Sequence, residues 1–496
     1  MTPNEGLTAA QASAPLAFTT AKLRVSRTPY RDGFPMHPVF LPRGNSATTV
    51  PVTFVNAANW RELRAALDSP ARGFADAAAF EPKAGRHCLL PAADGGLAGV
   101  LFALERPEEP SKDLFWPGAL PGLLPGGAYR FATAAHDQRL AALAFALGAY
   151  RFTRYRKQDA KEISLELPGN VDGEDLSRIV EGVTLARDLI NTPANDLGPA
   201  ELEAAARTLA DRHGAKLRAI VGDDLLEESF PLIHAVGRAA ARPPRLIDLT
   251  WGDPNHPRVT LIGKGVCFDS GGLDIKPESG MLNMKKDMGG AAAMLALAHM
   301  LMQRAIKLRL RVLIPAVENA ISGASFRPRD VYRSRKGLTV EIGNTDAEGR
   351  LILADAIALA DEDQPDLIAD MATLTGAARV ALGTEIPPFY TDDEALAAAL
   401  ADCAKSENDP LWRMPLWRPY EALLESKVAD VNNVASGNFG GSITAALFLR
   451  RFVTAAKAWL HFDVYAWNQA TKPGRPEGGE CQAARALYAL LVSRYG

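Results

Sequence analysis

From about residue 200 onward, short apolar runs alternate with segments of helical periodicity, and this alternation is the strongest constraint on the fold. The runs Val259–Gly263 and Leu308–Pro315 are almost continuously apolar, as strands buried on both faces of a sheet are. Further strands are predicted over Thr339–Ile342 and Leu367–Met371, and helices over Met288–Gln303 and Arg350–Asp361. The pattern predicts an α/β fold whose mixed, mostly parallel sheet has helices on both faces.

The 496 residues are enough for more than one domain, and we predict two. Residues 1–165 would form a smaller N-terminal α/β domain, residues 166–200 a linker region, and residues 201–496 the larger domain. The linker helix is expected over Gly173–Asn191, with Asp175 as its N-cap. The predicted N-terminal elements are strands over Thr48–Val55, His87–Pro91, Leu97–Leu104 and Ser164–Leu167, and a helix over Gln138–Tyr155.

The composition argues against several classes of protein. A net charge of −3 gives no sign of a nucleic-acid partner or an anionic membrane. The cysteines are too dispersed for a CxxC site and too few for a disulfide framework; they are Cys88, Cys267, Cys403 and Cys481. The N-terminus does not resemble a signal peptide, and no apolar stretch is long enough to span a bilayer. We therefore expect a cytoplasmic protein with reduced thiols, in which Cys267 is a buried small side chain.

Two glycine-rich, charged segments follow predicted strands, Gly263–Asp287 and Asn344–Leu351. Ligands bind at the carboxyl ends of parallel strands, so the two segments would converge if their strands are neighbours. Together they offer Lys264, Asp269, Lys276, Asp287, Asp346, Glu348 and Arg350. Four carboxylates in one cleft must be protonated, paired or bound to cations. Two divalent ions would balance them and leave Lys276 and Arg350 as a positive surplus, which suits an anionic transition state.

The alternative for each of these residues is a solvated loop charge, and the residue pattern leaves it open. Asp274, Glu278, Lys285 and Lys286 are expected to be surface charges of this kind. Other catalytic signatures are absent from the sequence: no GxGxxG opens a helix, and there is no P-loop, GxSxG or HExxH. His461 is expected to be a buried structural histidine.

The two charged segments match a known family. NTDAEGRL (Asn344–Leu351), GKGVCFDSGGLDIKP (Gly263–Pro277) and MKKDMGGAAA (Met284–Ala293) resemble the signature and metal-binding stretches of the leucyl aminopeptidase family of cytosolic dinuclear metallopeptidases. Further segments extend the resemblance over about residues 180–496. It implies hydrolytic release of N-terminal amino acids from peptides or amino-acid amides, and a homohexamer whose N-terminal domain governs assembly and access.

The resemblance also implies roles for individual residues. Two divalent ions, Mn²⁺ or Zn²⁺, would be bridged by Asp269 and Glu348; Lys264 and Asp287 would complete the tighter site and Asp346 the looser one. A ligating Lys264 must be neutral, so the metals would have to depress its pKa. Lys276 would stabilise the gem-diolate, and Arg350 would hold a bicarbonate ion as general base.

A substrate pocket is implied less specifically. Met284, Thr373 and Gly376 would line it, although Met284 could equally be ordinary core filling. Tyr465 stands where the family usually has a small residue, so it could reshape the pocket. Two alternatives from other classes are a DNA-binding regulator, to which the −3 charge gives little support, and a non-catalytic structural hexamer, which the presence of all seven expected residues opposes.

Overall fold

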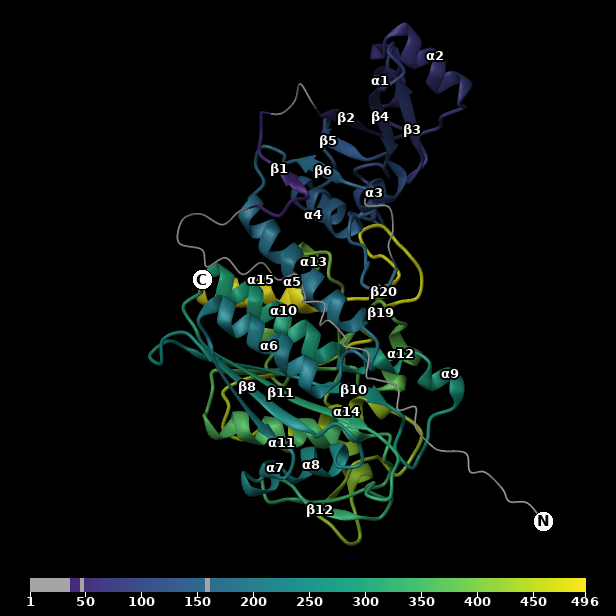
Figure 1. Cartoon of the computed structure of the whole chain (residues 1–496). Helices are drawn as coiled ribbons and strands as arrows, with labels where there is room; N and C mark the ends of the chain where they lie inside the picture. Colours follow the sequence, from purple (N-terminus) through teal and green to yellow (C-terminus); the bar gives the residue numbers. More distant parts are fainter. Residues whose placement is uncertain (1–35, 45–48, 157–160) are drawn as a thin grey trace, which may run out of the picture.

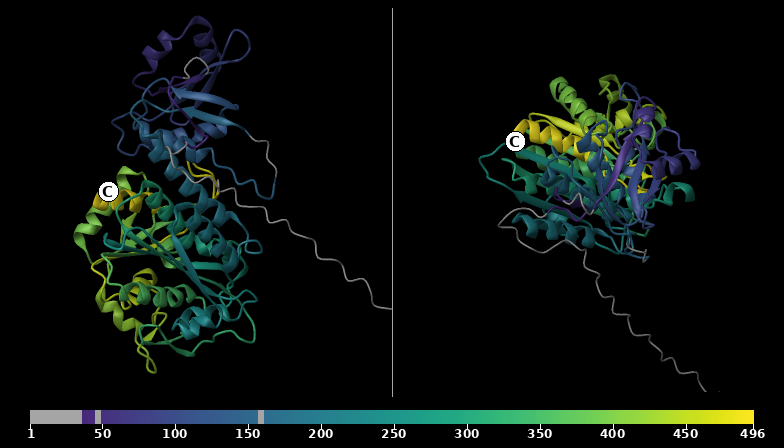
Figure 2. Two further views of the ribbon diagram at one scale, coloured as in Figure 1. Left: turned by 60° about the vertical axis from the view of Figure 1, so that its left-hand side comes forward. Right: turned by 90° about the horizontal axis from the view of Figure 1, so that it is seen from above.

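The computed structural model describes residues 36–44, 49–156 and 161–496, which form two α/β parts stacked end to end (Figures 1 and 2). The N-terminal part contains a six-stranded sheet. In spatial order its strands are β1 (Phe40–Leu41), β6 (Ile163–Glu166), β5 (Gly127–Phe131), β2 (Val50–Val55), β4 (Leu97–Ala103) and β3 (His87–Pro91). All neighbouring pairs are parallel except β3 with β4. The predicted N-terminal strands are confirmed, with residue 48 outside the described residues.

Helices cover both faces of this sheet. Helices α1 (Trp60–Ala66) and α2 (Ser69–Ala77) share a small core with β3 and β4, and α4 (Gln138–Gly148) packs on the opposite face. The 3-10 helix η1 (Trp116–Ala119) and α3 (Leu120–Leu123) lie next to α4. The prediction that the helix of α4 continues to Tyr155 is wrong. Arg151 donates a 2.8 Å hydrogen bond to the Gly148 carbonyl oxygen, which in a longer helix would accept from the amide of residue 152.

The larger sheet has nine strands and mixed direction. Its order is β16 (Trp412–Arg413), β15 (Pro388–Tyr390), β18 (Trp459–Asp463), β14 (Leu367–Ala372), β9 (Arg258–Gly263), β11 (Arg309–Asn319), β8 (Arg245–Trp251) and β7 (Lys216–Val221), with β10 (Gly265–Asp269) paired to β11. The central strands β18, β14, β9 and β11 run parallel. The predicted two-domain α/β fold, with a mixed and mostly parallel sheet between helices, is confirmed.

Helices form a layer on each side of the larger sheet (Figure 1). One layer contains α5 (Gly173–Asn191), α6 (Pro199–His213), α10 (Gly289–Arg304), α13 (Glu394–Ser406) and α15 (Ala484–Tyr495). The other contains α7 (Asp224–Glu227), α8 (Pro231–Gly237), α11 (Glu348–Glu362) and α14 (Gly441–Arg450). Shorter elements complete the larger part: α9 (Glu278–Met281), η2 (Met284–Met288), α12 (Gly376–Leu382), η3 (Arg418–Leu424) and a hairpin of β19 (Trp467–Asn468) and β20 (Gly478–Gly479).

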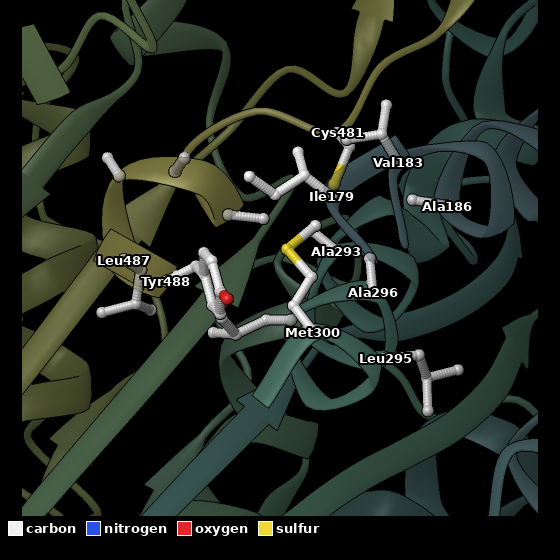
Figure 3. Close-up of a cluster of buried hydrophobic side chains, with 14 of the residues drawn as sticks. Ile179, Val183, Ala186, Ala293, Leu295, Ala296, Met300, Cys481, Leu487 and Tyr488 are labelled. Carbon is white, nitrogen blue, oxygen red and sulfur yellow. The ribbon is translucent and has the colours of Figure 1, made fainter. Parts of the chain in front are cut away.

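Helix α5 passes from the N-terminal part onto the larger one and packs against α10, which in turn packs against α15 (Figure 3). Tyr488 of α15 donates a 2.9 Å hydrogen bond to Asp175 of α5. Gly182 permits the close approach, because a Cβ there would lie 2.7 Å from Met300 Cε and 3.0 Å from the Ala296 carbonyl oxygen. The N-cap of α5 is Asp172, whose side chain accepts from the amides of residues 174 and 175. Asp175, the predicted cap, instead sits in the first turn and pairs with Arg139 and Arg178. Among the described helices, none is both long and apolar enough to cross a membrane.

One predicted strand belongs to a different sheet. Thr339–Ile342 contains β13 (Thr339–Glu341), which pairs with β12 (Val331–Arg333) and β17 (Val431–Asn432) in a separate three-stranded sheet. The segment that follows β13 therefore does not leave a neighbour of β9 or β10. The premise that the two charged segments follow neighbouring strands is wrong, and their convergence requires another cause.

Candidate active site

The carboxyl ends of the central strands meet at one edge of the larger sheet. Lys264 directly follows β9, and Asp269 is the last residue of β10. Thr373 follows β14, and Asp463 is the last residue of β18. Asp463 accepts hydrogen bonds from the amides of residues 374 and 375 and so fixes the loop after β14. The predicted site residues on these strands thus lie where parallel sheets bind ligands.

Lys264 is buried between two carboxylates. Its Nζ lies 2.8 Å from Asp287 Oδ2 and 2.8 Å from Glu348 Oε1, and it donates to the Thr373 carbonyl oxygen at 3.0 Å. Burial alone would lower the pKa of Lys264, but the surrounding carboxylates, Asp287 first, raise it instead. The other oxygen of Asp287 accepts from Thr373 Oγ1 at 2.7 Å. Without metal, one ammonium group therefore compensates only part of the charge of these two carboxylates, and Lys264 would have to lose a proton to become a ligand.

Lys276 makes the second pairing, with Asp269 and Asp346. Its Nζ lies 2.8 Å from Asp269 Oδ2 and 2.5 Å from Asp346 Oδ1. Asp269 Oδ1 accepts from Asn319 Nδ2 at 2.9 Å, so Asn319, at the end of β11, holds this carboxylate in place. Burial raises the pKa of Asp269 to about 6. The structure thus brings Lys276 to the carboxylates, as predicted, and adds Asn319, which the sequence did not suggest.

Glu348 is the carboxylate most in need of a further cation. Its Oε2 atom is buried and has no hydrogen-bond partner among the described residues. Burial, followed by the charge of Asp269, raises the pKa of Glu348 to about 8. Carboxylate oxygens of Asp269, Asp346 and Glu348 lie within 4.8 Å of one another. Since four carboxylates face only two ammonium groups here, the cluster has an excess of negative charge, and its oxygen ligands suit hard divalent ions.

Hydrogen bonds bring the segment after β13 to this cluster. Thr345 Oγ1 donates to the Gly271 carbonyl oxygen at 2.7 Å, and the Thr345 amide donates to Asp274 Oδ2 at 2.8 Å. Asn319 Nδ2 donates to the Thr345 carbonyl oxygen at 3.1 Å. Gly271 has φ +88°, a conformation that favours glycine. These contacts, and not a pairing of neighbouring strands, bring the segment to the cluster. They also show that Asp274 is a half-buried hydrogen-bond acceptor and that its prediction as a surface charge is wrong.

Arg350 lies on the pocket side of the first turn of α11. Its Nη1 donates to the Asn433 carbonyl oxygen at 2.6 Å, and no carboxylate in the described ranges lies within ion-pair distance of it. Burial lowers the pKa of Arg350 to about 10. Asn433 also donates to the Asn344 carbonyl oxygen at 2.8 Å and thereby ties this loop to the start of the helix. Asn433 is a further positioning residue that no sequence signal indicated.

A pocket of about 410 Å³ opens over the cluster. All four residues predicted to contact substrate line it: Met284, Thr373, Gly376 and Tyr465. The predicted ligands and catalytic residues line it as well, except Glu348, which is buried behind them. The ring of Tyr465 is partly buried, so it forms part of the wall.

Two basic residues of the pocket were not predicted. Lys286, expected to be a surface charge, is 2% exposed, and its Nζ lies 4.5 Å from the centre of the Tyr465 ring. Burial lowers its pKa to about 8. Arg379, on α12, has its guanidinium carbon 5.1 Å from the same ring. The prediction that Lys286 is a surface charge is wrong, because the 3-10 turn η2 buries both Lys286 and Asp287 just before the start of α10.

The remaining residues named in the sequence analysis do not line the pocket. His461 is fully buried and its Nδ1 lies 2.5 Å from Asp370 Oδ1, which confirms a structural histidine. Cys267 is buried, as predicted, and burial raises its pKa. Glu278 is exposed, and Lys285 donates to the Asn191 carbonyl oxygen at 2.7 Å.

Comparison with known proteins assigns the chain to a family. The profile described as the catalytic domain of the cytosol aminopeptidase family matches residues 184–488. The chain belongs to the cytosol aminopeptidase family. The N-terminal domain profile of M17 aminopeptidases matches residues 50–168, so both parts of the structure have family counterparts. The predicted family is confirmed, and the chain is a hydrolase of the aminopeptidase type.

Individual relatives agree with this assignment. The chain is 39% identical over 363 residues to a probable cytosol aminopeptidase from Roseiflexus castenholzii, covering 70% of this chain and 74% of that one. A solved cytosol aminopeptidase from Coxiella burnetii is 45% identical, with a TM-score of 0.88 over 93% of this chain and 100% of that one. The bottromycin maturation enzyme BotP in complex with Mn is 33% identical, with a TM-score of 0.81 over 90% of this chain and 99% of that one.

Proposed function

We propose that this aminopeptidase works with two divalent metal ions, Mn²⁺ or Zn²⁺, held by Lys264, Asp269, Asp287, Asp346 and Glu348. The observation that carries the proposal is the buried Glu348 Oε2 atom. Within the described part of the chain it has no hydrogen-bond partner, and the carboxylates around it outnumber the nearby ammonium groups. A buried carboxylate of this kind is costly unless a cation completes it. The Mn complex of the structural relative BotP supports the choice of metal.

When bound, the two ions would polarise the scissile carbonyl and lower the pKa of water. Lys276 would remain charged, because it keeps two carboxylate neighbours, and would stabilise the negative oxygen that develops at the carbonyl. Arg350, whose guanidinium has no carboxylate partner in the described structure, would hold a bicarbonate ion as general base. The N-terminal end of α11 adds unpaired amides to this anion site.

Substrates would be peptides or amino-acid amides. The pocket volume of about 410 Å³ fits one amino-acid side chain together with the reacting amide. Met284, Thr373, Gly376 and Tyr465 would contact the first residue of the substrate. By family likeness, the chain would work in the cytoplasm as a homohexamer, with the predicted N-terminal domain of residues 1–165 governing assembly and access; light scattering coupled to size exclusion would test the assembly.

The proposed reaction can be tested with a panel of aminoacyl-anilides. The protein would be stripped of metal, reloaded with Mn²⁺ or Zn²⁺, and its metal content measured alongside turnover. We expect hydrolysis that requires metal and that falls by roughly 100-fold or more in Lys276→Ala at unchanged metal content. Lys285→Ala is the matched control, because Lys285 pairs with a backbone carbonyl outside the pocket. Absence of turnover with two metals bound per chain would refute the proposal.

A further inference from the structure

The pocket contains two basic groups that the proposed chemistry does not use. Lys286 and Arg379 both line it, and both contact the ring of Tyr465. Neither has a carboxylate within ion-pair distance in the described part of the chain. The other pocket lysines differ, since Lys264 and Lys276 each lie between two carboxylates.

Lys286 is the more unusual of the two. Its side chain is 2% exposed, and within the described ranges its ammonium group makes no hydrogen bond and no ion pair. The face of the Tyr465 ring compensates part of the burial through a cation–π contact. A buried ammonium normally needs an anion or several acceptors as well. In the described chain no carboxylate pairs directly with Lys286 or with the exposed Arg379, and the charges of Asp287 and Asp463 act on Lys286 only from beyond ion-pair distance. The two cations therefore leave room for a substrate anion beside the Tyr465 ring.

Metal binding would not supply this anion. The carboxylates of the cluster are already shared between Lys264 and Lys276, and divalent ions would compensate them further. Lys286 directly precedes the proposed ligand Asp287, so the unpaired ammonium adjoins the reacting centre. A Cβ on Gly289 would lie 2.3 Å from Ala466 Cβ, which shows how closely the Tyr465 segment packs on the start of α10.

We propose that Lys286 and Arg379, with Tyr465 as the wall between substrate and protein, form a carboxylate-binding subsite in this pocket. The inference rests on the proposed aminopeptidase function and specifies its substrate class. The carboxylate is the acidic side chain of an N-terminal Glu or Asp, or the C-terminal carboxylate of a short peptide. The position of Lys286 beside Asp287 favours the side chain of the first residue.

Isosteric substrate pairs distinguish the two possible origins of the substrate carboxylate. The Mn²⁺-loaded enzyme would be assayed with glutamyl- and glutaminyl-anilide, which differ in the charge of the first side chain. Leu-Gly and Leu-Gly-amide differ in the charge at the other end. Each pair would be compared in the native protein, in Lys286→Met and in Arg379→Gln. Lys285→Met is the matched control, because it removes the same charge from the adjacent residue, which does not line the pocket.

We expect kcat/KM for glutamyl-anilide to exceed that for glutaminyl-anilide by about tenfold or more. Lys286→Met should abolish this ratio, Arg379→Gln should reduce it, and Lys285→Met should preserve it. A ratio that appears only in the Leu-Gly pair, and is lost in Lys286→Met, would assign the subsite to the C-terminal carboxylate. Ratios near one in both pairs would overturn the subsite even if leucyl-anilide is cleaved and the aminopeptidase proposal stands.

A binding measurement keeps the inference independent of turnover. Calorimetry of L-glutamate and L-glutamine with the Mn²⁺-loaded protein compares two products with identical α-groups. Tighter binding of glutamate that disappears in Lys286→Met supports the subsite, even if no anilide is hydrolysed and the proposed reaction fails. Equal affinities of the two amino acids in the native protein would refute it.

Discussion

Two buried glutamates of this chain face opposite situations. Both oxygens of Glu480 have partners: Oε1 accepts from the Cys481 amide at 2.9 Å, and Oε2 from Arg187 at 2.9 Å and Asn468 at 2.7 Å. Burial by itself would raise the pKa of Glu480, but the charge of Arg187 together with the hydrogen bonds from Arg187 and Asn468 lowers it. Glu348 has one oxygen on Lys264 and one that finds no partner among the described residues, and its pKa is raised to about 8.

This difference in hydrogen-bond partners distinguishes Glu480, which has a structural role, from Glu348, for which we propose a functional one. Arg187, on α5, also donates to the carbonyl oxygens of Leu147 and Gly474, so its pair with Glu480 joins α4, α5 and the C-terminal hairpin. That pairing is nearly complete within the protein, and nothing further needs to bind. Glu348 Oε2 has no such partner among the described residues, and a bound cation would provide one. Burial alone therefore does not identify a site, whereas burial with an unmet bonding requirement does.

The first prediction concerns Glu348→Gln. Removing this proposed metal ligand should lower metal content and reduce kcat/KM by about 10³-fold or more. In the metal-free protein the same change removes a carboxyl group whose charged form is incompletely paired, so the melting temperature should be unchanged or higher. Metal analysis, anilide kinetics and calorimetric melting of the stripped protein would be measured together. A variant that keeps both metals and full activity would remove Glu348 from the site.

The second prediction is the counterpart, Glu480→Gln. This substitution leaves the Arg187 guanidinium buried without its carboxylate, at a cost of about 3 kcal/mol. The melting temperature should fall markedly, with or without metal, while the variant that remains folded keeps native kcat/KM. Parallel melts of Glu480→Gln and Glu348→Gln in the stripped state provide the test. If both variants shift in the same direction by similar amounts, the distinction between the two glutamates is wrong.

The third prediction tests whether metal binding by the cluster depends on the residues that hold its carboxylates in place. Asn319→Ala removes the amide that holds Asp269 Oδ1 and the Thr345 carbonyl oxygen. Metal affinity or activity should fall by about 10- to 100-fold, as is typical for partners of metal ligands. Rescue of activity at high Mn²⁺ concentration would show that Asn319 acts through Asp269. Unchanged metal affinity would mean that Asp269 is positioned without it.

The sequence predicted which charged residues meet at the site because most of them lie in short charged segments that follow a strand. Asp269 and Glu348 could be found this way, since glycine-rich turns at strand ends are a local signal. Asn319 could not, because its role depends on the pairing of β10 with β11, which joins residues 50 positions apart. The location of β13 in another sheet is a similar long-range fact.

Lys286 shows a different limit. In an amphipathic helix or strand, neighbouring residues face different sides, so one of Lys286 and Asp287 would be expected at the surface. The turn η2 buries both, because it is packed between the pocket and the start of α10. Helix α4 likewise ends before Tyr155, and the side chain of Arg151 binds the carbonyl oxygen of its last residue, a contact that helical periodicity does not indicate. Local patterns therefore predict elements and strand ends, while tertiary packing decides which charges become buried.

The smallest expected effect comes from a pair of histidines, His213 and His299, that lies beside the ion pair of Glu181 and Arg212. His213 Nε2 lies 3.1 Å from His299 Nδ1, and burial lowers the pKa of His213 to about 3. The unfolded chain, with an ordinary histidine pKa of about 6.5, then binds more protons than the folded one. Stability is therefore present above about pH 6.5 and is lost as the pH falls below it, by about 1.4 kcal/mol at pH 5.5 for His213.

His213→Gln should remove most of this pH dependence, whatever it costs at neutral pH. Melting temperatures at pH 7.5 and 5.5 would be compared for the metal-free native protein, His213→Gln and the control His256→Gln, a partly exposed histidine. The drop between the two pH values should shrink in His213→Gln and persist in the control. An equal drop in all three proteins would show that burial without charge does not make this histidine pair acid-sensitive. The dependence of stability on how completely a buried group is paired would then apply to the two glutamates only.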